Sequence, residues 1–208
     1  MRQERVSQER VRPEEGVRAG RKRASSRGIL EEAASELFLE NTYDGTTIEQ
    51  ITQRAGVSRN TFFNYFQAKS DVLWASVDEA IDSLPDEFAE VPAATAPLDA
   101  VRAALVGAST RFGPDRLPLA VTQYDVMGTH AELITSGLPR FLRIAGDVER
   151  FLFDRLGTDA ALRARVIAFA VVAALAAAAD GWARAGTGRH PLCDYVAEAI
   201  TPICRGFA

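Results

Sequence analysis

The sequence predicts an all-α protein in which a small N-terminal three-helix head of the helix-turn-helix type is joined to a larger helical body. Apolar residues recur at spacings of three and four along most of the 208 residues, as they do on one face of a helix. No stretch alternates as a strand does. Gly56 divides the segment 46–69 into two short helical stretches, as a helix-turn-helix requires. We expect the head to span residues 25–70 and the body residues 71–208.

An arm precedes the head. Residues 1–24 are rich in Arg, Glu and Gln and lack apolar periodicity, which predicts a disordered or partly helical segment. The run from Arg18 to Arg27 contains five basic residues and no acidic residue. Such a run is either a solvated charge cluster or an arm that reaches DNA phosphates or the minor groove, and both interpretations stay open.

Charge is distributed unevenly along the chain. Residues 1–69 carry 12 basic and 10 acidic side chains, a net of +2, whereas residues 70–208 carry 12 basic and 18 acidic side chains, a net of −6. A near-neutral head on an acidic body suits a protein that binds nucleic acid at one end and not elsewhere.

The first helix of the head is expected to begin with a cap at Ser25 or Ser26 and to end by Asn41. Asp44 and Gly45 then form a turn. The apolar stripe of this helix consists of Ile29, Leu30, Ala33, Ala34, Leu37 and Phe38.

The helix-turn-helix contains its own start and stop signals. Thr46 can cap the first helix, and Glu49, three residues later, completes a capping box. Gly56 stands where that helix must end, a position that favours positive φ. Ser58 can cap the second helix. The side chains expected to face the core of the head are Ile48, Ile51, Ala55, Phe62 and Phe66.

The second helix presents side chains suited to contacting bases. Arg59 can bind O6 and N7 of guanine together, and Asn60 can bind adenine. The ring edge of Phe63 can contact a thymine methyl group. We therefore expect Arg59, Asn60 and Phe63 to read base pairs in a major groove.

The run GVSRNTFFNYFQAKSDVL, from Gly56 to Leu73, resembles the signature of the TetR family of transcriptional regulators. The resemblance is close from about Ser25 to Ala80, and beyond that it is one of length and helical pattern. It implies a homodimer, paired through the last two helices, that binds a palindromic double-stranded DNA operator. It also implies a body that binds a small-molecule ligand and forms the dimer interface.

The resemblance to the TetR family also implies which residues contact DNA phosphates. We add Arg27, the last residue of the basic run that begins at Arg18. These phosphate contacts set the register on DNA and carry little sequence information. Two departures bear on them: Gln67-Ala68 replaces a frequent Pro-Ser, and Asn64 takes a position often held by an aromatic residue. The expected phosphate-binding residues are Arg27, Thr47, Ser58, Thr61, Asn64, Tyr65 and Lys69.

The body is expected to be built from helices separated by Gly and Pro. Pro118 should lie in the first turn of its helix, and Gly137 and Pro139 should break another, which resumes at Leu138 or Pro139. Pro191 should open the last helix. The expected helices cover residues 69–84, 98–112, 116–128, 130–156 with that break, 159–185 and 191 onward, and residues 85–97 form a loop.

The helix beyond Asp159 is apolar on nearly all sides between Val166 and Ala179, and such a helix must be covered on every face. The rest of the subunit can cover part of it and a symmetric partner the remainder; the alternative is a core helix of a monomer. This apolar run has 14 residues, fewer than the roughly 18–20 that span a bilayer, so we expect no membrane contact. The first 28 residues are polar, which gives no secretory signal and predicts a cytoplasmic protein.

No catalytic constellation stands out in the sequence. His130 and His190 lack nearby Cys or paired carboxylates, and Cys193 and Cys204 have no metal-binding spacing. We expect no metal, no cofactor and no enzymatic activity. The remaining enzyme hypothesis is that the body catalyses an unknown reaction while the head binds DNA.

Two non-enzymatic functions therefore compete. A DNA-organising protein would use the same head and needs no cavity, whereas a ligand-released repressor needs an apolar cavity in the body. Phe112, Tyr124, Met127 and Phe141 are bulky enough to line one, with plain core packing as the alternative for each. The run TFFNYFQAKSDVLW also resembles the TetR subgroup that includes mycofactocin-system regulators, which implies an acyl-CoA-like ligand. Its final residue, Trp74, is expected to join head and body.

Overall fold

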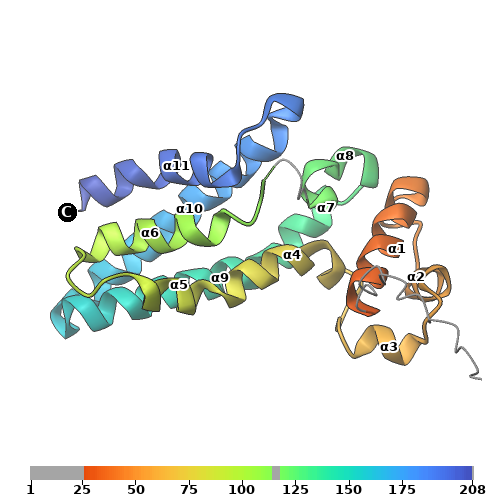
Figure 1. Ribbon diagram of the computed structural model, residues 1–208, viewed down its shortest axis with the longest axis horizontal. Coiled ribbons are helices and arrows are strands. Elements are labelled where there is room, and N and C mark those ends of the chain that lie inside the picture. The colour runs from red at the N-terminus through yellow and green to blue at the C-terminus, as the bar shows by residue number, and fades with distance from the viewer. Residues whose placement is uncertain (1–25, 114–117, 208) are drawn as a thin grey trace, which may run out of the picture.

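The computed structural model describes residues 26–113 and 118–207, which form an elongated helical molecule with the head at one end (Figure 1). Every regular element in these ranges is a helix, which confirms the predicted fold class. The predicted arm, residues 1–24, lies outside the described residues. The α-helices are α1 (Ser26–Asn41), α2 (Ile48–Ala55), α3 (Arg59–Phe63), α4 (Asp71–Asp82), α5 (Leu84–Glu90), α6 (Pro97–Ser109), α7 (Leu119–Thr122), α8 (Tyr124–Met127), α9 (His130–Leu156), α10 (Ala161–Arg184) and α11 (Leu192–Gly206); short 3₁₀ helices lie at Thr158–Ala160 and Gly186–Gly188.

The head is built by α1, α2 and α3 around one apolar core. Phe62 is fully buried, and its ring lies 5.4 Å from that of Phe66, as their spacing predicted. Ile51 is also fully buried, whereas Ile48 and Ala55 lie half-buried at the edge of the same cluster. The predicted stripe of α1 is buried except for Ile29, which is half-buried: Leu30, Ala33, Ala34, Leu37 and Phe38.

α4 belongs to both parts of the molecule. Its first turns bury Leu73 and Trp74 in the cluster of the head. Its last turns bury Ala80 against Phe112 and Trp182 of the body. Because one continuous helix is anchored at both ends, a displacement of its body end must displace the head.

The core of the body lies among α5, α6, α9, α10 and α11. α10 packs between α9 and α11, and α6 packs on α11 (Figure 1). Many of the side chains at the centre have no exposed surface, including Val101, Val148, Leu152, Ile167, Val171 and Ile200.

Two predictions for the body were wrong about where helices begin and end. The expected loop over residues 85–97 contains α5, because Pro85 occupies a first turn that needs no N–H, and Leu84 and Phe88, one turn apart, are both buried. The helix expected over residues 116–128 is two short helices in its described part. They are separated at Gln123 and held against the head, since the Tyr43 amide donates to the Met127 carbonyl at 2.7 Å.

The break predicted at Gly137 and Pro139 does not occur, and α9 runs continuously from His130 to Leu156. A Cβ at position 137 would lie 3.0 Å from the Trp74 ring, so glycine lets the helix approach that ring closely. Pro139 removes the hydrogen bond to the Thr135 carbonyl, but Thr135 is exposed and water can replace the donor. Close packing on one face and solvent on the other therefore explain the continuous helix.

Within the described residues, one helical stretch, Thr158–Arg184, is long and apolar enough to cross a membrane by length and composition alone. Its most apolar 18-residue window has a mean hydropathy of 2.0, and 39% of that window is buried within the chain. The expectation that the remaining surface needs a cover therefore stands.

Candidate DNA-binding head and ligand cavity

The start of α2 differs by one residue from the prediction. Thr47, not Thr46, is the cap: its hydroxyl accepts from the Gln50 amide at 3.2 Å, and the Gln50 side chain accepts from the Thr47 amide at 2.8 Å. Thr46 is buried, and its hydroxyl donates to the Thr42 carbonyl at 2.8 Å and the Leu37 carbonyl at 3.2 Å. The predicted capping box exists, but Thr47 and Gln50 form it instead of Thr46 and Glu49.

The turn between α2 and α3 agrees with the prediction. Gly56 has φ 67° and ends α2, a conformation that costs a glycine little. Ser58 caps α3, with its hydroxyl accepting from the Thr61 amide at 3.1 Å. This geometry buries Phe62 of α3 in the head and leaves the other side of the helix exposed.

The three side chains predicted to read bases are all exposed on α3. Phe63 is 44% exposed, unusually high for an aromatic side chain beside a packed core. The guanidinium of Arg59 lies 5.5 Å from the centre of the Phe63 ring and forms an ion pair with Glu49. Arg59 must leave Glu49 before it can bind a base, while Asn60 carries no such constraint in the described structure.

The residues predicted to bind phosphate fall into two groups, those on or beside α2 and α3 and those held by internal contacts. In the first group, Asn64 and Tyr65 are exposed beside α3, and Thr47, Ser58 and Thr61 take part in the caps described above. The remaining two, Arg27 and Lys69, are held by internal contacts.

Arg27 ties α1 to α4, and Lys69 ties the turn before α4 to the loop between α1 and α2. Arg27 donates to Glu31 of its own helix at 3.0 Å and to the Ala75 carbonyl of α4 at 3.0 Å. The Lys69 ammonium donates to the carbonyls of Tyr43 at 2.7 Å and Thr46 at 2.8 Å, and partial burial lowers the pKa of this ammonium. These bonds give both residues a role in the fold of the head, and phosphate binding would compete with them.

A cavity of about 300 Å³ lies in the body, and residues of every helix from α4 to α11 line it. Its described walls are almost entirely apolar, with polar side chains at Ser109, Tyr124, His130 and Asp180. Phe112, Tyr124 and Phe141 line it, as predicted. Met127 does not line it: this side chain is fully buried in the head cluster, because the short α8 packs against α1.

The cavity shares its walls with the helix that carries the head. Trp74 of α4 and Phe141 of α9 both line it, and their ring centres are 6.3 Å apart. Trp74 also belongs to the core of the head. One side chain therefore touches both the cavity and the DNA-binding part, the position expected of it from the sequence.

Comparison with known proteins identifies both parts of the chain. Residues 30–75 match the model of bacterial regulatory proteins of the tetR family, and residues 95–208, more than half of the chain, match the MftR C-terminal domain. The chain belongs to the TetR family. This is a family of transcriptional regulators that bind DNA, not of enzymes.

Several curated TetR-type regulators are similar in sequence. TcmR of Streptomyces glaucescens is 39% identical over 145 residues, which cover 67% of this chain and 64% of TcmR. MftR of Mycobacterium tuberculosis, named for the regulation of mycofactocin biosynthesis, is 27% identical over 93 residues, or 45% of this chain. The matched segments span 47% of MftR and 34% of FasR of Mycolicibacterium smegmatis, about half or less of those proteins.

Solved structures share the fold at low identity. FadR of Bacillus halodurans, a fatty acid degradation regulator, superposes with a TM-score of 0.60 at 18% identity, covering 89% of this chain and 97% of FadR. FadR of Bacillus subtilis, solved with stearoyl-CoA, gives 0.51 at 14% identity over 86% of this chain and 97% of that one. These likenesses establish the fold of the TetR-family chain and nothing finer.

The sequence did not point to an ionic cluster that joins α9 to α4. Arg140 binds both carboxylate oxygens of Asp78 at 2.7 Å and one oxygen of Asp71 at 3.1 Å. The Arg140 side chain is 15% exposed, and its guanidinium lies 5.2 Å from the centre of the Trp74 ring. We call Arg140, Asp71 and Asp78 the Arg140 cluster.

The Arg140 cluster also reaches the turn that follows α3. The second oxygen of Asp71 accepts from the amides of Gln67 at 3.0 Å and Ala68 at 2.9 Å, in the turn that follows α3. Asp71 and Asp78 lie on one face of α4, two turns apart, and this spacing is the signal that would have pointed to a shared partner. The partner, Arg140, is about 60 residues away and could be found only from the fold.

Proposed function

We propose that this TetR-family protein is a repressor that binds a palindromic operator as a homodimer and releases it when a small, largely apolar molecule enters the cavity. The observation that carries the proposal is the place of Trp74, which is at once a wall of the cavity and part of the core of the head. A ligand that displaces this ring must act on both parts.

The head supplies the DNA-binding half of the proposal. Exposed Arg59, Asn60 and Phe63 on α3 suit base readout in the major groove, and exposed Asn64 and Tyr65 suit phosphate contacts beside it. A two-fold dimer presents two such helices, so its operator has half-sites about one helical turn apart or somewhat more.

The cavity supports an apolar ligand of limited size. An apolar cavity of roughly 150 Å³ can bind benzene, so about 300 Å³ accepts two rings or part of an alkyl chain. An acyl-CoA-like ligand, which the FadR complex with stearoyl-CoA makes a natural candidate, fits only if its acyl portion enters and the charged remainder stays outside. The proposal therefore specifies the buried part of the ligand as apolar.

The switch would operate through α4 and the Arg140 cluster. The bonds of Arg140 hold Asp78 and Asp71 of α4 against α9, and Phe141, the next residue, contacts Trp74 beside the cavity. A ligand that separates Trp74 from Phe141 strains these bonds and shifts the head relative to the body. A tenfold loss of operator affinity requires about 1.4 kcal/mol of difference between the two states.

The competing role, a DNA-organising protein without a ligand, leaves the cavity unexplained. A protein of that kind gains nothing from about 300 Å³ of unfilled apolar volume next to α4, since cavities lower stability.

Because a protein that binds an operator must reach the DNA, we propose that it acts in the cytoplasm.

The test begins with selection of the operator from random DNA by the purified protein. Small molecules that co-purify with the protein are identified by mass spectrometry, and each is added to an operator titration. We expect at least one apolar compound to weaken operator binding about tenfold or more. If a specific operator is found but no compound changes its affinity, the ligand switch fails and the DNA-organising role replaces it.

A further inference from the structure

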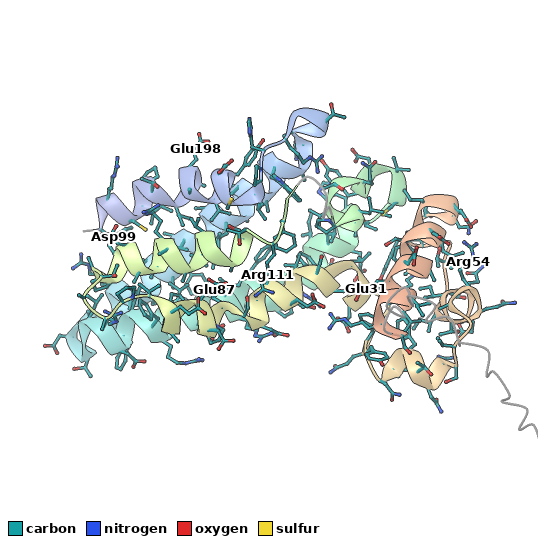
Figure 2. All side chains as sticks on the ribbon, in the orientation of Figure 1. Glu31, Arg54, Glu87, Asp99, Arg111 and Glu198 are labelled. Atoms are coloured by element: carbon teal, nitrogen blue, oxygen red, sulfur yellow. The ribbon has the colours of Figure 1, made fainter. Side chains whose placement is uncertain are left out.

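A second cavity, of about 610 Å³, lies where α6 and α10 begin and where α9 and α11 end. Figure 1 shows these four helix ends gathered at the end of the molecule opposite the head. Asp99, one of the lining residues, is labelled there in Figure 2. The volume falls within the roughly 300–1,000 Å³ that is typical of small-molecule sites. We call this the distal cavity.

The distal cavity is separate from the cavity beside Trp74, which we call the first cavity. The two share α6, α9, α10 and α11 but have no lining residue in common. On α10, Ile167 lines the distal cavity and Leu175 lines the first, while Val171, between them on the same face, has no exposed surface. A packed layer therefore divides the two cavities, and each needs its own ligand.

Positive charge is concentrated in the distal cavity. Arg102 of α6, Arg163 of α10 and Arg205 of α11 line it, and Asp99 supplies the one carboxylate among the described lining residues. This excess of two positive charges stands out in a body whose residues 70–208 carry a net of −6. The described lining of the first cavity contains no arginine or lysine. The two cavities therefore favour ligands of different charge.

The three arginines of the distal cavity retain hydrogen-bond donors. Among the described residues, neither Arg102 nor Arg205 has a hydrogen-bond or ion-pair partner, although Arg102 is half-buried. Arg163 donates to the Phe207 carbonyl, and a guanidinium carries five N–H donors. Moving a charged group out of water costs free energy unless a partner compensates it. A carboxylate is such a partner, because a guanidinium can bind it through two parallel hydrogen bonds.

The remainder of the distal cavity is largely apolar. Leu98, Leu156 and Phe207 line it and keep part of their surface exposed. Ile167 is fully buried in its wall, and burial raises the pKa of the Cys204 thiol beside it, which keeps that group neutral. An inorganic anion would leave this apolar surface in water, whereas a ligand with an apolar part would cover it. The lining therefore suits an anion that also carries an apolar part.

We propose that the distal cavity is a second ligand site, which binds a carboxylate attached to an apolar chain or ring. The three arginines bind the carboxylate, and the apolar side chains of α6, α9 and α11 cover the rest. Asp99, in the first turn of α6, repels a second negative charge, so a monocarboxylate suits the site better than a phosphate ester does. This site goes beyond the ligand switch of the proposed function, which uses the first cavity.

Ligand class is tested by isothermal titration calorimetry of the full chain with three probes. Octanoate carries a charge and an apolar chain, 1-octanol lacks the charge, and acetate lacks the chain. We expect octanoate to bind at least about tenfold more tightly than either of the others, because only octanoate satisfies both the arginines and the apolar walls.

The role of the arginines is tested with Arg102→Gln and a control, Arg150→Gln. Arg150 is an exposed arginine of α9 that lines neither cavity. We expect Arg102→Gln to raise the Kd for octanoate about tenfold or more, since a charge-assisted hydrogen bond is lost, and the control to leave it within about twofold. Arg205→Gln should act in the same direction as Arg102→Gln, so the result does not depend on one variant.

The position of the bound octanoate is tested by thiol labelling. Leu156→Cys at the distal cavity and the control Leu138→Cys, on the same helix but lining neither cavity, are made in a chain that carries Cys193→Ser. Cys204, which is 5% exposed, remains, and its reaction is measured in the Cys193→Ser chain and subtracted. Saturating octanoate should slow the reaction of a maleimide at position 156 about tenfold and leave the rate at position 138 unchanged.

Three outcomes would overturn the inference. If 1-octanol binds as tightly as octanoate and Arg102→Gln has no effect, the arginines bind no ligand. If inorganic phosphate displaces octanoate at equal concentration, the site does not select an apolar carboxylate. If octanoate binds but does not slow the reaction at position 156, it occupies another site. Each outcome leaves the proposed function standing, because the effect of apolar compounds on operator binding is measured separately.

Discussion

The head and the body are both helical, yet different kinds of contact hold them. In the head, capping and turn residues such as Thr47, Gly56 and Ser58 each bond to a residue within four positions of themselves. In the body, the decisive contacts join residues far apart in the chain, as Arg140 and Asp78 do across 62 positions. The contrast teaches that the DNA-binding part is specified locally, whereas the part that would sense a ligand is specified by packing.

The contrast predicts that the head can be unfolded without unfolding the body. Phe62→Ala removes a fully buried ring from the core of the head, which should cost about 3–5 kcal/mol. We expect operator binding to be lost while sedimentation still reports the native association state. Circular dichroism during urea unfolding should show an early loss of part of the helix signal.

Phe63→Ala is the control, because Phe63 is the next residue in α3 but is 44% exposed. It should leave the unfolding curve nearly unchanged and alter only the preference for one base pair. A single cooperative transition for Phe62→Ala, shifted as a whole, would mean that head and body fold as one unit.

The second prediction concerns the junction between the two parts. Arg140→Ala leaves Asp71 and Asp78 without their shared partner at a site where all three side chains are at most 28% exposed. We expect a loss of about 2–3 kcal/mol in the free energy of unfolding, measured in urea.

Arg143→Ala is its matched control. Arg143 joins Asp82 across the same two helices at 2.6 Å, but these side chains are 51% and 61% exposed. Exposed pairs contribute at most about 1 kcal/mol, so the control should unfold almost as the wild type does. Equal losses for the two variants would show that the Arg140 cluster has no special part in the junction.

The sequence predicts the structure of the head better than that of the body. Gly56, Ser58, Phe62 and Phe66 adopt the predicted roles, because turn, cap and helical spacing are local properties. Even in the head, the cap is formed by Thr47 instead of Thr46, since two adjacent threonines offer the same chemistry and burial decides between them.

In the body, local rules failed where tertiary contacts oppose them. Pro139 and Gly137 predict a break, yet contact with Trp74 keeps α9 continuous. Phe112, Tyr124 and Phe141 were placed in the cavity correctly, but Met127, equally bulky, packs into the head instead. Size and apolarity suggest a lining residue, but which side of a short helix faces the cavity depends on neighbours that one sequence does not specify.

The third prediction sharpens the role of the exposed face of α3. Arg59→Ala should cost about 1–3 kcal/mol of affinity for the selected operator and relax the preference at one base pair. Glu49→Gln, which removes the ion-pair partner of Arg59, should strengthen operator binding because the arginine is then free. Both are measured by fluorescence anisotropy against operator and random DNA. Equal weakening on the two DNAs would assign Arg59 to phosphate.

The smallest expected effect separates the two roles open to Lys69. The TetR resemblance implies a phosphate contact, whereas the structure binds the ammonium to the carbonyls of Tyr43 and Thr46. Lys69→Met retains most of the side-chain volume and removes the charge. If the internal bonds dominate, the free energy of unfolding falls by about 1–1.5 kcal/mol and the dependence of operator affinity on salt is unchanged. If the phosphate contact dominates, stability is nearly unchanged, every DNA binds more weakly, and the slope of log K against log salt falls by about one. A change in both quantities would mean that the ammonium leaves the carbonyls of the head only when DNA is bound, which would make Lys69 a residue whose contacts change between the free and bound states.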